Sequence, residues 1–147
     1  MATLPDPKWN YLDTFITVAP DSVVTESKVP EPREQPTIPQ LEYELLSGAP
    51  GKYTQQEVQF AVHVRRLGLS PKEVKARRQE LWDAFFSKPH ACLRASALPK
   101  KYGWGIHFDP QGRITLVPIE SSEYRQFAKG TKAGPKVVAA MRSSRKS

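Results

Sequence analysis

The chain has 147 residues, of which 39% are hydrophobic, 14 are proline and one is cysteine. This composition indicates one domain with a real core, and a lone cysteine excludes an internal disulfide and any multi-cysteine zinc site. The net charge of +7 lies entirely in residues 124–147, which hold seven cations and no acid.

The start of the chain and its hydropathy set the expected compartment. Residues 1–7 have neither the basic region nor the apolar core of a signal peptide. No apolar run approaches the roughly 18 residues that a membrane-spanning helix needs. We therefore expect a soluble, cytoplasmic protein with no membrane partner. Residues 1–10 are expected to be flexible, and a single domain is expected over residues 11–129.

The first predicted elements of this domain are a strand and a loop. Residues 12–18 alternate in polarity and are rich in β-branched side chains, which predicts a strand. Residues 20–36 contain four prolines among charged residues. This stretch is too rich in proline for a helix or a central strand, so it is predicted to be an extended loop.

Three helices are predicted next, each after a capping box. In this motif a hydroxyl accepts from the third helical amide, and a Glu or Gln reaches back. The boxes pair Thr37 with Gln40, Thr54 with Glu57, and Ser70 with Glu73. The predicted helices span residues 38–47, 55–67 and 71–86. Residues 58–64 also alternate like a strand, but the capping box and the glycine that follows the segment favour a helix.

The second half of the chain indicates a β-hairpin. Residues 104–108 and 113–119 flank the sequence Asp-Pro-Gln-Gly, which is typical of a tight turn. Ser121 or Ser122 is expected to cap a short helix. The patterns together predict an α+β domain, in which the N-terminal strand and the hairpin form an antiparallel sheet packed by about three helices. Residues 130–147 are predicted to be a basic tail, with 137–142 as the part able to dock on the fold.

The segment 85–108 concentrates the candidate chemistry, because it holds the cysteine, two of three histidines and four Lys or Arg. Cations beside Tyr and Trp suit phosphate contact combined with stacking on a planar group. The predicted ligand-binding residues are Arg94, Ser96, Lys101, Tyr102, Trp104 and His107. A structural role stands beside this hypothesis, with Trp104 as a core anchor and its flanking glycines in a turn or bulge.

Cys92 is the candidate nucleophile of the same segment. A nucleophilic thiol needs a cationic neighbour and usually a histidine base, for which His90 and His107 are the candidates. The favoured alternative is a packed core thiol, because cysteine is among the most buried residue types. The three histidines lack metal-site spacing, and nothing in the sequence implies a metal or a cofactor.

Several motifs together carry a resemblance to a known family. They include FFSK at residues 85–88, CLRAS at 92–96 and KYGWGIH at 101–107. From about residue 11 to residue 145, the chain resembles a family of small, mostly bacterial proteins that is catalogued only as a domain of unknown function. The resemblance implies one complete domain that includes the basic end near Met141. It brings no activity, cofactor or catalytic residue with it.

Three functions remain open at this level. The favoured one is a binding module for an anionic or phosphorylated ligand, such as a nucleotide or nucleic acid. Its expected partner is therefore a polyanion or a phosphorylated small molecule. The second is a small cysteine-dependent enzyme that uses Cys92 with a histidine. The third is an interaction or oligomerisation protein, with the Trp104 segment at the interface of a dimer.

Overall fold

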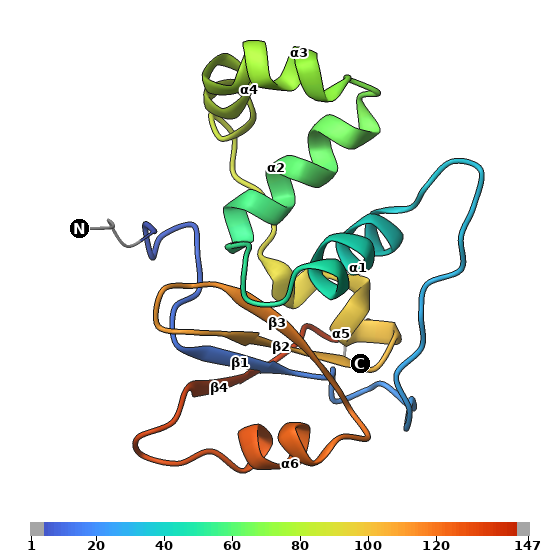
Figure 1. Cartoon of the computed structure of the whole chain (residues 1–147). Coiled ribbons are helices and arrows are strands. Elements are labelled where there is room, and N and C mark those ends of the chain that lie inside the picture. Colours follow the sequence, from blue (N-terminus) through green and yellow to red (C-terminus); the bar gives the residue numbers. More distant parts are fainter. Residues whose placement is uncertain (1–4, 144–147) are drawn as a thin grey trace.

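The computed structural model describes residues 5–143, and a four-stranded sheet lies at its centre (Figure 1). The sheet order is β3-β2-β1-β4. The strands are β1 (Thr14–Thr17), β2 (Trp104–Phe108), β3 (Ile114–Pro118) and β4 (Lys136–Ala139). The β2–β3 hairpin and the β1–β2 pair are antiparallel, as expected, whereas β4 is parallel to β1. The prediction of a purely antiparallel sheet is therefore wrong. The basic end of the chain contributes a fourth strand, β4, which runs parallel to β1 and makes the sheet mixed.

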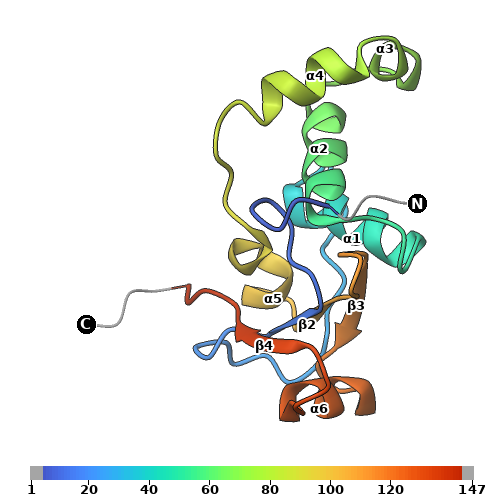
Figure 2. The same cartoon turned by 90° about the vertical axis from the view of Figure 1, so that its left-hand side faces the viewer.

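The described residues form six α-helices. They are α1 (Ile38–Gly48), α2 (Gln55–Arg66), α3 (Pro71–Ala76), α4 (Arg78–Phe85), α5 (Ala97–Lys101) and α6 (Ser122–Lys129). Helices α1, α2 and α5 lie on one face of the sheet, and α6 covers the other (Figure 2). Helices α3 and α4 stack on α2, away from the sheet. None of the described helices has the length and apolar character that crossing a bilayer requires.

The expected number of about three helices is corrected by this count. Residues 71–86, predicted as one helix, form α3 and α4, which meet at Arg77 with a non-helical φ of −118° and ψ of 19°. The chain changes direction there (Figure 2), and Trp82 of α4 packs on Phe60 of α2. Helix α5 was not predicted, and a short 3₁₀ turn (Leu93–Ala95) precedes it.

The predicted helix starts are explained by side-chain caps. Thr37, Thr54 and Ser70 each accept a hydrogen bond from the third helical amide. At Thr54 the reciprocal bond from the Thr54 amide to Glu57 is also made, at 3.0 Å. These bonds satisfy amides that would otherwise lack a partner at a helix start.

Helix α2 is buried on two sides, which accounts for its strand-like alternation. Val58 and Val62 belong to the core above the sheet. Phe60 lies on the other side, where its ring centroid is 5.1 Å from that of Trp82 in α4. A helix between two layers needs apolar residues on both faces, so its sequence loses the single stripe of an ordinary surface helix.

Candidate functional site

The two aromatic residues of the predicted ligand-binding set, Tyr102 and Trp104, contact the proline-rich loop, and Trp104 also contacts α1. The Trp104 Nε1–H donates to the Lys28 carbonyl at 2.8 Å, and the Trp104 ring centroid lies 5.4 Å from that of Tyr43. The Lys28 amide donates to the Tyr102 carbonyl at 2.8 Å. These bonds attach the loop to the sheet, and they occupy the indole N–H. Lys101 is exposed beside them.

Arg94 and His107 make separate contacts elsewhere. The Arg94 Nε–H donates to the Ala139 carbonyl at the end of β4, at 2.6 Å. The His107 ring stacks on Phe127 of α6, with centroids 4.4 Å apart. Burial lowers the pKa of His107, although the Asp109 carboxylate acts in the opposite direction. Arg94 therefore connects the turn before α5 to β4, and His107 connects β2 to α6.

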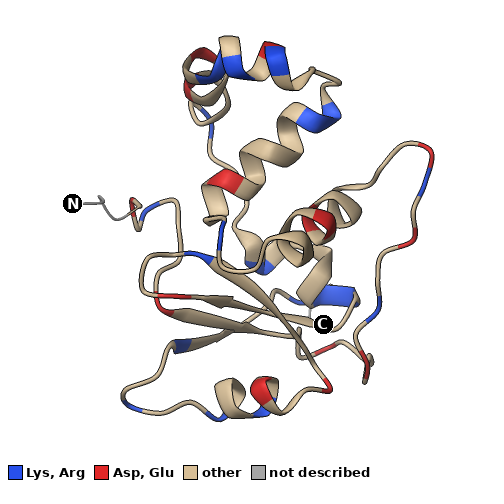
Figure 3. Ribbon diagram, viewed as in Figure 1, with Lys and Arg blue, Asp and Glu red and all other residues tan. Residues whose placement is uncertain are grey.

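The six predicted ligand-binding residues are thus not gathered around one cavity. Ser96 alone among them lines the pocket described below. Figure 3 shows that Lys and Arg also lie on α2, α3, α4 and α6, each of which carries Asp or Glu as well. Ligand binding by the other five residues stays a prediction.

Cys92 interacts with a tyrosine. Its Sγ lies 3.2 Å from the Tyr11 hydroxyl oxygen. Burial, together with Cys92, raises the pKa of Tyr11 to about 12. The imidazole of His90 is engaged with the Phe85 carbonyl, at 2.7 Å, and no described histidine hydrogen-bonds to Cys92. Among the described residues no group of three or more His, Cys, Asp or Glu could hold a metal ion.

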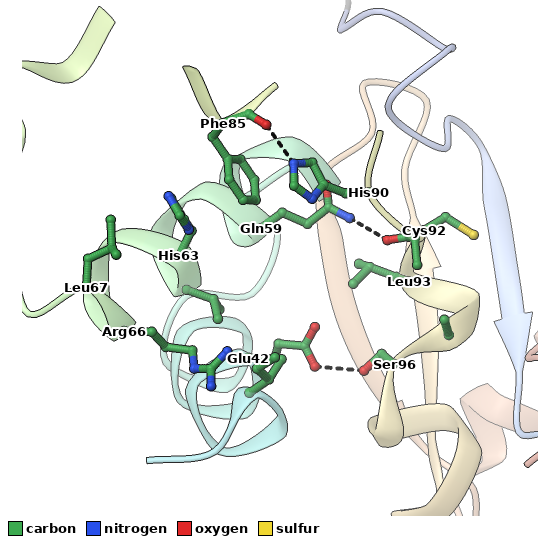
Figure 4. A pocket seen from close by; sticks show the side chains of 14 residues that line it. Glu42, Gln59, His63, Arg66, Leu67, Phe85, His90, Cys92, Leu93 and Ser96 are labelled. Atoms are coloured by element: carbon green, nitrogen blue, oxygen red, sulfur yellow. Dashed lines mark hydrogen bonds between the residues drawn. The ribbon is translucent and has the colours of Figure 1, made fainter. Parts of the chain in front are cut away.

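A pocket of about 570 Å³ lies between α1, α2 and the chain that runs from the end of α4 to α5. Its apolar lining includes Val62, Phe85 and Leu93, with Ile38 and Leu67 also part of it. Ile38 and Leu67 are 44% and 56% exposed, which is unusual for large apolar side chains. Six polar side chains complete the lining: Glu42, Gln59, His63, Arg66, His90 and Ser96 (Figure 4).

Helical spacing brings the polar residues of α2 to the pocket. Gln59, His63 and Arg66 follow one another at intervals of four and three, which places them on one face of the helix. Gln59 also holds the opposite wall, because its Nε2 donates to the Ala91 carbonyl at 2.8 Å. On the same wall the Leu93 amide donates to Gln55 at 3.0 Å. The two walls are therefore connected by hydrogen bonds from α2.

Glu42 is the buried polar group of the pocket. It is only 6% exposed, and its Oε1 accepts from the Ser96 hydroxyl at 2.7 Å (Figure 4). No ion pair reaches it among the described residues. Burial raises the pKa of Glu42 to about 7, although the Ser96 hydrogen bond acts in the opposite direction. Near neutral pH this carboxyl can therefore exist in either protonation state.

Sequence reasoning missed Glu42, although a signal was present. Along α1, apolar residues at 41, 45 and 46 form the inward stripe, and position 42 lies within it. A glutamate there is buried by the helix that carries it. An acidic residue at a core position of an amphipathic helix is the pattern that could have identified it.

Two histidines stack on one phenylalanine beside the pocket. The ring of Phe85 lies between His63, with centroids 4.2 Å apart, and His90, at 3.9 Å. Burial lowers the pKa of His63, and the nearby His90 adds to this effect. His63 is therefore mainly uncharged at neutral pH. Arg66 is then the permanent cation of the pocket, and it forms no ion pair with any described residue.

Among known proteins, the chain matches one family. A family model described as a family of unknown function, DUF6157, matches residues 7–146. No curated protein matches the chain, and no solved structure does either.

Proposed function

We propose that this protein, which belongs to the DUF6157 family of unknown function, is a binding module. The family itself brings no activity to the chain. Its pocket takes a small organic molecule with an apolar body and one anionic group. The pocket itself is the observation that carries this proposal. Its volume of about 570 Å³ is ordinary for a small-molecule site, and mainly apolar walls with few polar groups are typical of such sites.

Arg66 is the proposed contact for the anionic group. Its guanidinium is always charged and can bind a carboxylate or a phosphate through two parallel hydrogen bonds. It is exposed on the last turn of α2, where no acidic side chain pairs with it among the described residues. The apolar body would lie against Phe85, Leu93 and Val62.

The proposal keeps the anionic ligand class but places it at a different site. The sequence had pointed to Lys101 and Trp104, whereas the support now comes from Arg66. Ser96 belongs to both sets of residues. A nucleic-acid partner draws less support, because Asp or Glu occurs together with Lys or Arg on α2, α3, α4 and α6 (Figure 3), whereas a nucleic-acid interface concentrates cations on one face.

The two other functions also draw less support. The Cys92 sulfur is turned away from the pocket interior (Figure 4) and lies beside Tyr11. A dimer through the Trp104 segment would use a side chain whose indole N–H is already bonded to Lys28.

Displacement of a fluorescent probe tests the proposal. The dye 8-anilinonaphthalene-1-sulfonate combines an apolar body with an anionic group, and 3-phenylpropionate is a smaller competitor. We expect the dye to bind, the competitor to displace it, and Arg66→Ala to weaken both by about tenfold. Arg65→Ala is the matched control, because Arg65 is an exposed neighbour on α2 that does not line this pocket. Equal affinity of the two variants, or no binding at all, would overturn the proposal.

A further inference from the structure

We infer that the ligand of this pocket is a zwitterion, an α-amino acid with an apolar side chain, whose ammonium group pairs with Glu42 while its carboxylate meets Arg66. This inference rests on the proposed function and names the ligand class of the same site.

The hydrogen bonding of the Glu42 carboxyl is incomplete among the described residues. One carboxyl oxygen accepts from Ser96 at 2.7 Å. No described residue donates to the other oxygen, Oε2, and Figure 4 shows the carboxyl turned toward the pocket interior. A carboxyl at 6% exposure with a single neutral donor is costly to ionise, because buried charges require a counter-charge or several hydrogen bonds. The missing partner has room to arrive from the pocket.

No cation that lines the pocket neutralises Glu42 among the described residues. From α2 the pocket receives Arg66 and His63, and from the chain after α4 it receives His90 and Cys92. None of them forms an ion pair with Glu42. On α1 itself, the nearby acid Glu44 is exposed and accepts a hydrogen bond from Gln40. Ser96, from the start of α5, supplies a hydroxyl without charge.

The free protein already compensates for the missing cation by protonating Glu42. Burial raises the pKa of Glu42 to about 7, so the carboxyl binds a proton where an ordinary glutamate would be ionised. An incoming ammonium group can take over this role, and it adds a charge-assisted hydrogen bond. A perturbed carboxyl in a concave pocket is the kind of group that binding sites contain.

The two charged groups of the pocket select the ligand together. A ligand with only an amine would meet the unpaired cation Arg66, and a ligand with only a carboxylate would be repelled by ionised Glu42. A zwitterion satisfies both groups, because its two charges are held on one small framework. The volume of about 570 Å³ leaves space for an apolar side chain beside Phe85 and Leu93.

The sign of the pH dependence separates this ligand class from simple acids. An ammonium group lowers the pKa of Glu42 on binding, so the affinity of an amino acid should rise between about pH 5.5 and about pH 8. A carboxylate without an amine should show the reverse, because ionisation of Glu42 opposes it. Protonation of His63 at low pH favours the carboxylate of either ligand, and His90 faces both ligands alike, so the difference between the two ligands reports Glu42.

Isothermal titration calorimetry with three related compounds provides the test. L-phenylalanine has both charged groups, 3-phenylpropionate lacks the amine, and phenethylamine lacks the carboxylate. At about pH 8 we expect phenylalanine to bind about tenfold more tightly than either analogue. Glu42→Gln should weaken phenylalanine binding and strengthen 3-phenylpropionate binding. Glu44→Gln, on the same helix, is the matched control and should change neither.

The possible outcomes distinguish this inference from the proposed function. If 3-phenylpropionate binds in an Arg66-dependent way but phenylalanine is no tighter, the anion pocket stands and the amino-acid inference is overturned. If none of the three compounds binds, both are overturned. The wild-type pH profiles of phenylalanine and 3-phenylpropionate test the inference without any variant, and parallel profiles would contradict it.

Discussion

On the face of the sheet that α6 covers, aromatic rings pack against one another and the buried Tyr124 hydroxyl has a hydrogen-bond partner. On the opposite face, a pocket lies beside a carboxyl that has one hydrogen bond and no ion pair among the described residues. Phe15 of β1 lies between Tyr124 and Phe127 of α6, with centroids 5.4 and 5.0 Å away. The Tyr124 hydroxyl accepts from the Val18 amide at 2.8 Å. Across the sheet, Glu42 has one hydrogen bond from Ser96. The α6 face is therefore stabilised by packing, whereas the pocket face retains the free-energy cost of burying the Glu42 carboxyl without a counter-charge from any described residue. Binding sites commonly retain such a cost.

The largest predicted effect is on the pH dependence of the unfolding free energy, and it comes from Glu42→Gln on the pocket face. The pKa of Glu42 is raised from its usual 4.5 to about 7 in the folded chain. A raised carboxyl pKa means that stability is greatest at low pH and is lost as pH rises through the folded value. Relative to Glu42→Gln, the wild type should lose about 3 kcal/mol of unfolding free energy between about pH 4 and about pH 8. Urea titrations over this range would measure it. Parallel pH curves for the two proteins would show that the carboxyl is not desolvated.

The second effect is on the α6 face, at Gly105. A methyl group there would lie 2.6 Å from Phe15 Cζ and 2.9 Å from Tyr124 Cε2. Gly105→Ala should therefore cost about 2 kcal/mol, because ring and backbone must move apart. Gly48→Ala is the control, since no heavy atom lies within 4 Å of the added carbon. Similar urea midpoints for the two variants would contradict the dense packing assigned to this face.

The smallest effect is expected from a single hydroxyl on the α6 face. Tyr124→Phe leaves the Val18 amide without its acceptor, and an unpaired buried donor costs about 1 kcal/mol. Tyr43→Phe removes a hydroxyl that makes no hydrogen bond among the described residues, so it should be close to neutral. Equal stability of the two variants in thermal unfolding would mean that the Val18 amide finds another acceptor.

Local signals in the sequence were enough for much of the fold. The caps at Thr37, Thr54 and Ser70 depend on residues three positions apart, and the hairpin turn depends on four consecutive residues. The break at Arg77 was not predictable in the same way, because neither glycine nor proline stands there and no local stop signal marks the position. Pairing of β4 with β1 depends on segments that are distant in the chain, and no local pattern encodes it.

The candidate site was only partly predictable for a related reason. Cations, aromatics and glycines in one segment suggested a site, but Trp104, Arg94 and His107 are used to join the loop, β4 and α6. The pocket instead combines α1 and α2 with residues 85–96 of that segment, among which only Ser96 was a predicted ligand-binding residue. Proximity along the chain does not imply a shared cavity, whereas an acid on the apolar stripe of a helix indicates a buried carboxyl directly.

The parallel pairing of β1 with β4 also constrains the order of folding. Thr14 is paired with Lys136, which is 122 residues later in the chain. On its other side Thr14 is paired with Phe108, which is 94 residues later in the chain. Because β2 precedes β4 in the chain, β1 can pair with β2 first, and its second edge stays open until β4 arrives. Both pairings of β1 close large loops, which is slow compared with forming the helices and the hairpin. An intermediate with β1 as an open edge strand is therefore expected, and docking of β4 is expected to be the late step that removes this aggregation-prone edge.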